Sequence, residues 1–129
     1  MTTRGKLWFD EHVRYVMAGD IAGMVNNTFH DDATYYHNFH FFDSPPPYVL
    51  SGKENIIKAM SVIFERQGKM RVGEVLDWSE SDNHIALQIL VTSPNTGSWL
   101  ITDFFGLRDG KVFEYFGYGR QLPLNLALP

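Results

Sequence analysis

The sequence has 129 residues, a length that predicts a single domain with one core over residues 1–129. Its 11 Lys and Arg against 15 Asp and Glu give a net charge of -4, so no basic stripe is available for a nucleic-acid partner. The absence of cysteine excludes disulfides, thiolate metal sites and a cysteine nucleophile, and it is compatible with a reducing compartment. Because no 18-residue apolar run and no apolar leader are present, we expect a cytoplasmic protein without a membrane partner.

The chain begins with a predicted amphipathic helix over residues 6–18. At about 100° per residue, its apolar side chains fall on one continuous arc. His12 lies inside this arc, and Tyr15 lies at its edge. Gly19 ends the helix, since glycine readily adopts the backbone conformation that closes a helix.

A second helix and a short strand follow. Asp20 caps the second helix, which is expected to end near residues 29–30 and to be followed by a polar turn at 31–32. Residues 33–39 are rich in β-branched and aromatic residues and predict a strand. Because side chains alternate along a strand, one face carries Tyr35, His37 and Phe39.

The middle of the chain contains a stiff loop and a third predicted helix. The prolines of residues 43–47 exclude a central strand there. Residues 51–54 have the Ser-x-x-Glu form of a capping box and open a helix that Gly68 closes. The apolar side of this helix carries Ile56, Met60, Ile63 and Phe64.

From residue 69 onward the pattern changes to strands, which are predicted at 70–78, 84–92, 98–108 and 111–120. Asp109 and Gly110 form a strong hairpin signal between the last two. Three helices around a short strand, followed by a four-stranded meander, predict an α+β fold. We expect a strongly curved antiparallel sheet whose concave face, with the three N-terminal helices, encloses a cavity that takes a ligand.

One carboxylate lies in the middle of an otherwise apolar strand. The alternate residues Trp99, Ile101, Asp103 and Phe105 share one face. Burying an ionised Asp without partners is costly, so Asp103 reaches water, pairs with a buried donor or takes up a proton. All three outcomes suit a pocket, and we expect Asp103 to point into the cavity.

Four local motifs follow one another along nearly the whole chain, at residues 18–25, 29–34, 51–56 and 103–112. In this order they resemble the SnoaL-like, ketosteroid isomerase-like branch of the nuclear transport factor two-like superfamily, a cone-shaped, cystatin-like α+β fold. That family includes polyketide cyclases, ketosteroid isomerases, dehydratases, epoxide hydrolases and members without known activity. The resemblance therefore implies a fold rather than one function.

The resemblance also implies roles for individual residues. Asp103 falls where ketosteroid isomerases keep a protonated Asp that donates to the developing oxyanion, and polyketide cyclases place their acid–base carboxylate similarly. His37 takes the position of the isomerase general base and His12 that of the oxyanion Tyr, which argues against steroid isomerisation itself. The Asp-Arg-Asp set of limonene-type epoxide hydrolases is absent, because its positions carry Leu87, Ile89 and Gly117.

These residues give a specific hypothesis for the site. His37 and Asp103 form an acid–base pair, and His12 polarises a substrate oxygen. In the alternative, all three are satisfied polar groups of the core, with His12 bonded to a carbonyl and Asp103 bonded to Tyr15 or Tyr35. The candidate substrate-binding residues, each of which also suits simple core packing, are Tyr15, Tyr35, Phe39, Met60, Trp99 and Tyr115.

No metal is expected, because His30, His37 and His40 do not have the spacing of a compact ligand motif. No cofactor is expected either, since the sequence has no nucleotide-binding Gly-rich loop. The leading prediction is a cofactor-independent acid–base enzyme that cyclises, isomerises or dehydrates a small, largely apolar carbonyl compound that is polyketide-, terpenoid- or steroid-like. The alternatives are a non-catalytic small-molecule binding protein and a dimerising module whose own aromatic residues fill the cavity. We also expect a homodimer, formed through an apolar outer sheet surface that includes Phe104, Phe116 and Tyr118.

Overall fold

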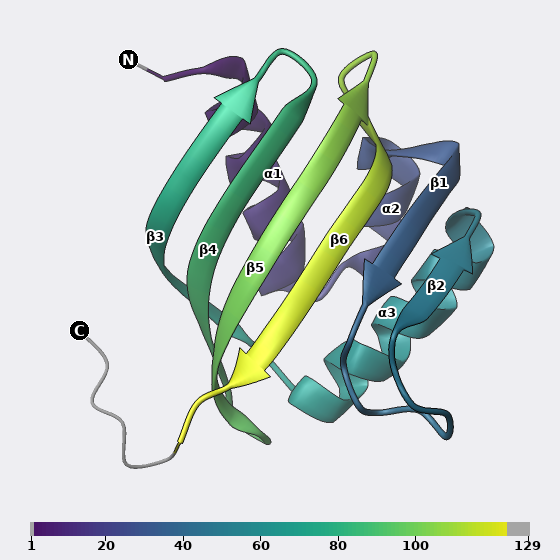
Figure 1. Cartoon of the computed structure of the whole chain (residues 1–129), viewed down its shortest axis with the longest axis vertical. Helices are drawn as coiled ribbons and strands as arrows, with labels where there is room; N and C mark the ends of the chain where they lie inside the picture. Colours follow the sequence, from purple (N-terminus) through teal and green to yellow (C-terminus); the bar gives the residue numbers. More distant parts are fainter. Residues whose placement is uncertain (1, 124–129) are drawn as a thin grey trace.

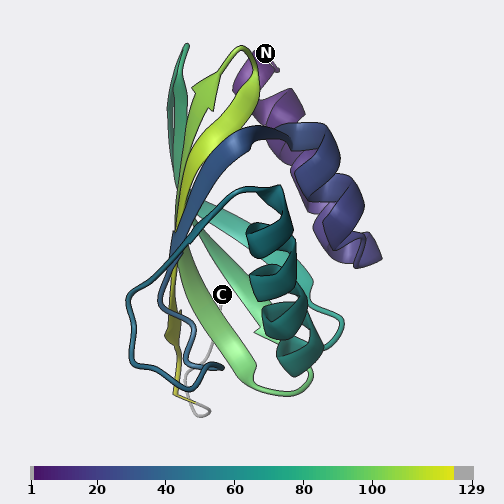
Figure 2. The same ribbon diagram turned by 90° about the vertical axis from the view of Figure 1, so that its right-hand side faces the viewer.

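The computed structural model describes residues 2–123. It contains the helices α1 (Arg4–Ala18), α2 (Ile21–Thr28) and α3 (Lys53–Gln67). The strands are β1 (Phe29–His37), β2 (Tyr48–Ser51), β3 (Arg71–Ser81), β4 (His84–Ser93), β5 (Gly97–Arg108) and β6 (Lys111–Gln121). They form one six-stranded sheet in the order β2-β1-β6-β5-β4-β3. All three helices lie on the same face of this sheet (Figures 1 and 2).

The predicted α+β fold, with a curved sheet beneath three helices, is confirmed. The sheet is not antiparallel throughout, however, because β1 and β6 pair in parallel. After β1 the chain forms β2, α3 and the first three strands of the meander before it returns as β6 beside β1. Side-chain alternation predicts which face of a strand is buried, but it does not give the direction of a partner so distant in sequence.

The predicted capping box at the start of α3 is wrong. Ser51 belongs to β2, where it pairs with Thr34 of β1, and its hydroxyl lies 3.4 Å from the Thr34 hydroxyl. The residue that precedes α3 is Gly52, with φ of 86° and no side-chain hydrogen bond to the helix. The short strand β2 was not predicted, since its four residues directly follow the proline-rich loop.

Strand β1 begins earlier and ends earlier than predicted. Helix α2 ends at Thr28, and residues 31–32 lie within β1 rather than in a turn. Both of these carboxylates have cationic partners, since Asp31 pairs with Lys53 at 3.1 Å and Asp32 pairs with Arg108 at 3.0 Å. Phe39 lies beyond the end of β1, although its side chain is still buried.

The other predicted boundaries agree closely with the structure. Asp20 caps α2 by accepting from the Gly23 amide at 3.0 Å, and Gly19 and Gly68 follow the ends of α1 and α3. The hairpin between β5 and β6 turns at Asp109 and Gly110, whose φ values are 54° and 74°. None of the helices within residues 2–123 combines the length and the apolar character needed to cross a membrane.

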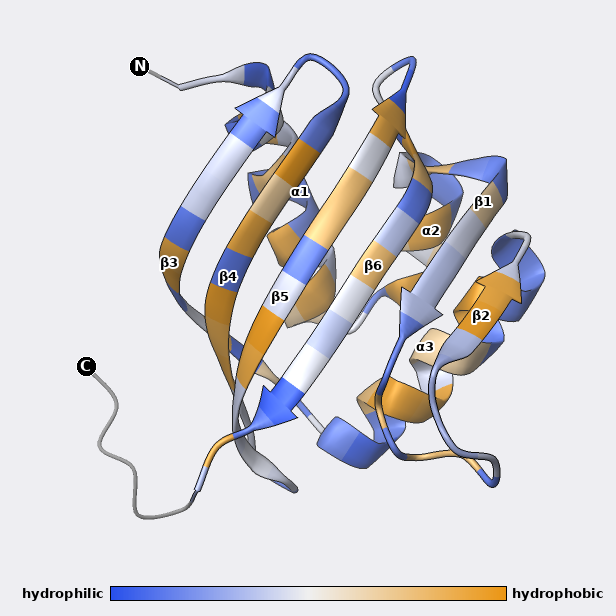
Figure 3. Cartoon of the chain, viewed as in Figure 1, coloured by the Kyte–Doolittle hydropathy of each residue, from blue (hydrophilic) through white to orange (hydrophobic). Residues whose placement is uncertain are grey.

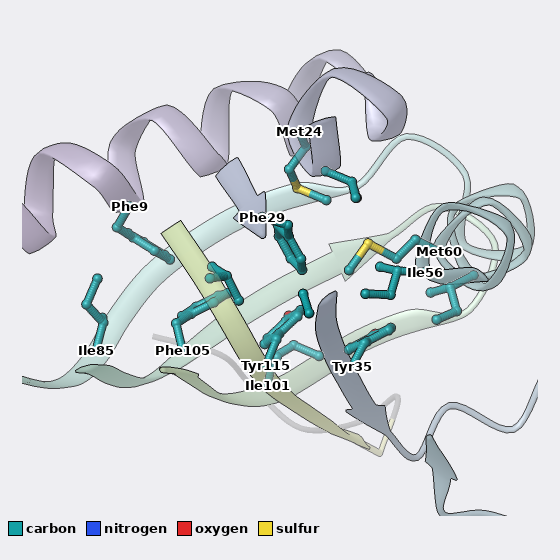
Figure 4. Close-up of a cluster of buried hydrophobic side chains, with 14 of the residues drawn as sticks. Phe9, Met24, Phe29, Tyr35, Ile56, Met60, Ile85, Ile101, Phe105 and Tyr115 are labelled. Atoms are coloured by element: carbon teal, nitrogen blue, oxygen red, sulfur yellow. The ribbon is translucent and has the colours of Figure 1, made fainter. Parts of the chain in front are cut away.

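The main core lies between the helices and the concave face of the sheet. Apolar residues dominate β4, and in β5 they lie on both sides of a hydrophilic band in the middle of the strand (Figure 3). The predicted inner face of β5 is confirmed, because Trp99, Ile101, Asp103 and Phe105 are all buried. In Figure 4, Met24 of α2 and Met60 of α3 extend from the helices toward the sheet, whose wall there includes Tyr35 and Tyr115.

Candidate active site

A cavity of about 100 Å³ lies between the three helices and the concave face of the sheet. Most of its lining is apolar. The lining side chains that carry polar groups come from α1, α3 and three strands, and they are His12, Tyr35, Gln67, Trp99, Asp103 and Tyr115. The lining within residues 2–123 contains no Lys or Arg, so no cation is available there to balance a charged ligand.

Asp103 is buried at the wall of this cavity, with 6% of its surface exposed. The Tyr115 hydroxyl donates a hydrogen bond to Oδ1 of Asp103 at 2.8 Å. Burial raises the pKa of Asp103 to about 7, although the hydrogen bond from Tyr115 acts in the opposite direction. At neutral pH both protonation states are therefore populated, as a group that takes up and returns a proton requires.

Gly117 makes room for the hydrogen bond between Tyr115 and Asp103. It lies opposite Asp103 in the register of β5 and β6, and two residues after Tyr115 on the same face. A Cβ atom at Gly117 would lie 2.8 Å from the Tyr115 hydroxyl oxygen. The phenol of Tyr115 thus occupies the space that a side chain at residue 117 would need.

Tyr35 places a second phenol beside Asp103. Its ring stacks on the ring of Tyr115 with a centroid distance of 4.9 Å. Burial, together with the nearby charge of Asp103, raises the pKa of Tyr35, so its hydroxyl stays protonated at neutral pH. Within residues 2–123 this hydroxyl has no hydrogen-bond partner, and it is therefore free to donate to a ligand in the cavity.

His12 reaches the cavity from α1. Its ring stacks on Trp8 at 5.2 Å and meets the edge of Phe105 at 5.1 Å. Burial lowers the pKa of His12 to about 4, so the imidazole is neutral at neutral pH. Within residues 2–123 its Nδ1 has no hydrogen-bond partner, and so the expected bond to a carbonyl is not formed by this atom.

The predicted pair of His37 and Asp103 is not formed. His37 and Asp103 lie in the same cross-strand row, but Gly117 of β6 lies between them. Two strand spacings put their backbones about 10 Å apart. His37 accepts from the Phe39 amide through Nδ1 at 3.1 Å, its Nε2 has no partner within residues 2–123, and its ring lies 4.8 Å from that of Tyr48. It is fully buried and does not line the cavity.

Most of the other predicted binding residues do line the cavity. These are Tyr35, Phe39, Met60, Trp99 and Tyr115. Tyr15 does not line the cavity, and its hydroxyl accepts from Nδ2 of Asn27 at 3.2 Å. Neither Tyr15 nor Tyr35 is the partner of Asp103, which is Tyr115.

Sequence reasoning missed Gln67, the last residue of α3, which is 1% exposed and lines the cavity. A polar residue on the buried side of the predicted helix was the available signal. Among residues 2–123, no group of three or more His, Asp and Glu lies close enough together to hold a metal ion.

Comparison with known proteins gives a family and a fold. The family described as a SnoaL-like domain matches residues 9–115. A comparison with curated proteins finds no match.

Solved structures share the fold at low identity. AclR, a putative hydroxylase from Streptomyces galilaeus, is 19% identical, with 96% of this chain and 83% of that chain covered and a TM-score of 0.72. TerC, crystallised with polyporic acid, is 14% identical, with 89% and 90% covered and a TM-score of 0.72. An NTF2-like protein from Anabaena variabilis is 12% identical, with 91% and 87% covered and a TM-score of 0.74. At these identities the likeness establishes the NTF2-like fold alone.

Proposed function

The chain belongs to the SnoaL-like domain family, and on this premise we propose that it is a cofactor-independent enzyme that moves protons on a small, largely apolar carbonyl compound. The observation that carries the proposal is the buried carboxyl of Asp103 at the wall of the cavity. Its pKa of about 7 suits proton transfer at neutral pH, and Tyr115 holds it in place.

In the proposed reaction, ionised Asp103 removes a proton from the carbon beside the substrate carbonyl. Negative charge then develops on the carbonyl oxygen, where the Tyr35 hydroxyl or the neutral imidazole of His12 donates a hydrogen bond. A neutral imidazole is able to stabilise such an oxygen without being charged itself. Protonated Asp103 then returns the proton, to another carbon in an isomerisation or to a departing hydroxyl in a dehydration. In a cyclisation, the same carbanion attacks a second carbonyl of the substrate, and that oxygen takes up the proton.

The test uses 2-tetralone, a neutral bicyclic ketone with acidic protons beside its carbonyl. In D₂O, the wild-type protein is expected to accelerate the replacement of these protons by deuterium, which proton NMR follows directly. The Asp103→Asn variant keeps the shape of the residue but not its basicity, so the acceleration should fall by at least ~100-fold.

One outcome of the same experiment favours the non-catalytic alternative. If 2-naphthol, the flat counterpart of the tetralone enol, binds to the wild-type protein while 2-tetralone exchanges only at the buffer rate, the cavity binds ligands without catalysis. That result would contradict the proposed enzyme.

We also propose that a second copy of the chain covers the outer face of the sheet. Aromatic rings form a continuous group there, since Phe116 stacks on Tyr36 at 4.3 Å and meets Phe104 at 5.9 Å. Tyr118 extends this group and is 36% exposed. Sedimentation equilibrium should give twice the chain mass for the wild type and a monomer for Phe116→Lys, and a wild-type monomer would contradict the dimer.

A further inference from the structure

The lining of the cavity includes a polar side chain, Gln67, that the proposed proton transfer does not use. Gln67 lies at the end of α3 and is almost completely buried, yet its side chain lines the cavity. A buried carboxamide is costly unless its donors and acceptor are used. The hydrogen bonds around Gln67 therefore indicate which of its atoms is left for a ligand.

The oxygen of the Gln67 carboxamide is already engaged. The Trp99 indole donates from Nε1 to Oγ1 of Thr96 at 2.9 Å, and the Thr96 hydroxyl donates in turn to Oε1 of Gln67. Because an indole N–H only donates, the Thr96 oxygen is the acceptor of the first bond and its proton is available for the second. Within residues 2–123, Nε2 of Gln67 has no hydrogen-bond partner and is not among the fully enclosed unpaired atoms. It is left as an unpaired donor on a side chain that lines the cavity.

The turn between β4 and β5 fixes the position of Gln67. Ser93 donates from its hydroxyl to the backbone carbonyl of Gln67, and Nδ2 of Asn95 donates to the carbonyl of Arg66 at 3.1 Å. The Ser93 hydroxyl oxygen also accepts from the Thr96 amide at 3.0 Å. The end of α3 and the turn that holds its last side chain thus form one hydrogen-bonded unit.

Asp103 and the Gln67 unit are separated by an apolar wall. Asp103 and Trp99, whose indole begins the chain of bonds to Gln67, lie four residues apart on β5, which is about 13 Å along a strand. Between them on the inner face lies Ile101, which pairs with Ile89 of β4. Without a lining Lys or Arg, an anionic group in this space would be unpaired.

We propose that Gln67 donates a hydrogen bond to a second oxygen of the substrate. The cavity would then select uncharged, flat compounds that carry one oxygen at the Asp103 end, a second oxygen at the Gln67 end and an apolar ring system between them. This inference rests on the proposed function, because the first oxygen is the carbonyl that Asp103 and its neighbours act on.

The test compares the binding of 2,6-dihydroxynaphthalene and 6-methyl-2-naphthol, which differ only in whether the far end carries an oxygen. Calorimetry gives both dissociation constants, for the wild type and for Gln67→Met. The ratio of the two constants should change by about tenfold in favour of the methyl compound in the variant, since the second hydroxyl loses its partner. An unchanged ratio would overturn the inference.

Two further variants separate recognition from damage to the fold. Asn95→Ala removes a bond from the same turn without touching the Gln67 carboxamide, so its ratio should equal that of the wild type. Thr96→Val keeps Gln67 but removes the hydroxyl that orients it, so its ratio should shift in the direction of Gln67→Met, and it carries the test if Gln67→Met does not fold. A shift in Asn95→Ala as large as that in Gln67→Met would overturn the inference.

Binding of 2-naphthol distinguishes the two proposals. If the wild-type protein binds 2-naphthol and accelerates the exchange of 2-tetralone, but neither Gln67→Met nor Thr96→Val changes the ratio, only the inference about the second oxygen fails. If none of the three naphthols binds to the wild-type protein and 2-tetralone exchanges only at the buffer rate, both proposals are contradicted.

Discussion

Asp103 and His37 lie in the same cross-strand row on the inner face of the sheet, but their side chains have different surroundings. Both are buried, and burial moves the pKa of each toward the neutral form, to about 7 for Asp103 and about 4 for His37. Asp103 touches the cavity and has a phenol as its partner, whereas His37 is enclosed by aromatic rings. Burial and a shifted pKa are thus shared, and access to the cavity is what distinguishes the two residues.

The strand between them accounts for this difference. Gly117 has no side chain, and the Tyr115 phenol uses the free space to reach Asp103. His37, on the far side of Gly117, accepts instead from the amide of Phe39 in its own segment. The row therefore contains a candidate reactive group on one side of β6 and a structural group on the other.

The largest expected effect is on activity, and it distinguishes Asp103 from His37. Asp103→Asn should reduce the exchange of 2-tetralone by at least ~100-fold, as proposed above, because no carboxylate remains to take the proton. His37→Asn keeps an acceptor for the Phe39 amide and should leave the exchange rate within about threefold of the wild type. Equal losses in both variants, with both proteins folded by circular dichroism, would break the comparison.

The next effect tests the role of Gly117. In Gly117→Ala the new Cβ displaces the Tyr115 hydroxyl from Asp103, so the exchange rate should fall by about tenfold, the loss expected for one hydrogen bond to the reacting group. Tyr115→Phe should give a similar loss by removing the hydroxyl. Because both changes act on one interaction, the double variant should be no slower than the slower single variant, and additive losses would contradict this account.

A separate effect concerns the stability of the fold and its dependence on pH. The pKa of Asp103 is about 7 in the folded protein against 3.8 as a model value, so ionisation destabilises the fold as pH rises from about 4 to 7. At about 1.4 kcal/mol per pKa unit, this amounts to about 4 kcal/mol above pH 7. Relative to the wild type, Asp103→Asn should therefore gain stability against urea as pH rises from 4 to 8. A difference that does not vary with pH would show that the carboxyl is not shifted.

The contribution of His37 to stability should depend on pH with the opposite sign. The pKa of His37 is lowered from 6.5 to about 4 by burial, so the unfolded chain binds a proton that the folded protein does not bind between these values. Stability is therefore lost as pH falls from 6.5 toward 4. The loss of stability in His37→Asn, relative to the wild type, should be smallest near pH 4 and largest above pH 7, as urea unfolding at several pH values would show. The reverse trend would contradict the burial of a neutral His37.

Much of the fold could be predicted from the sequence, because apolar periodicity and turn residues are local signals. They give three helices, the meander and the inward face of Asp103, all of which agree with the structure. The parallel pairing of β1 with β6 has no local signal, since it depends on which strand the chain returns to. The same limit accounts for the wrong partner of Asp103, because strand order separates it from His37.

The residues missed in the site have the same explanation. Tyr115 was predicted to line the pocket, but its hydrogen bond to Asp103 depends on the register of β5 and β6 and on the small size of Gly117. Gln67 gains its orientation from a turn that is 29 residues away in sequence. Neither arrangement follows from the spacing of residues within one element.

The most direct test of the account is the titration of Asp103 itself. Carbon-13 NMR of the protein labelled at the aspartate side-chain carboxyl carbon, with the signal assigned by its loss in Asp103→Asn, reports the protonation of this group between pH 3 and 9. The account predicts a midpoint near 7, in step with a rise in the exchange rate of 2-tetralone through the same pH range. A midpoint near 4, or an exchange rate that does not follow the titration, would contradict it.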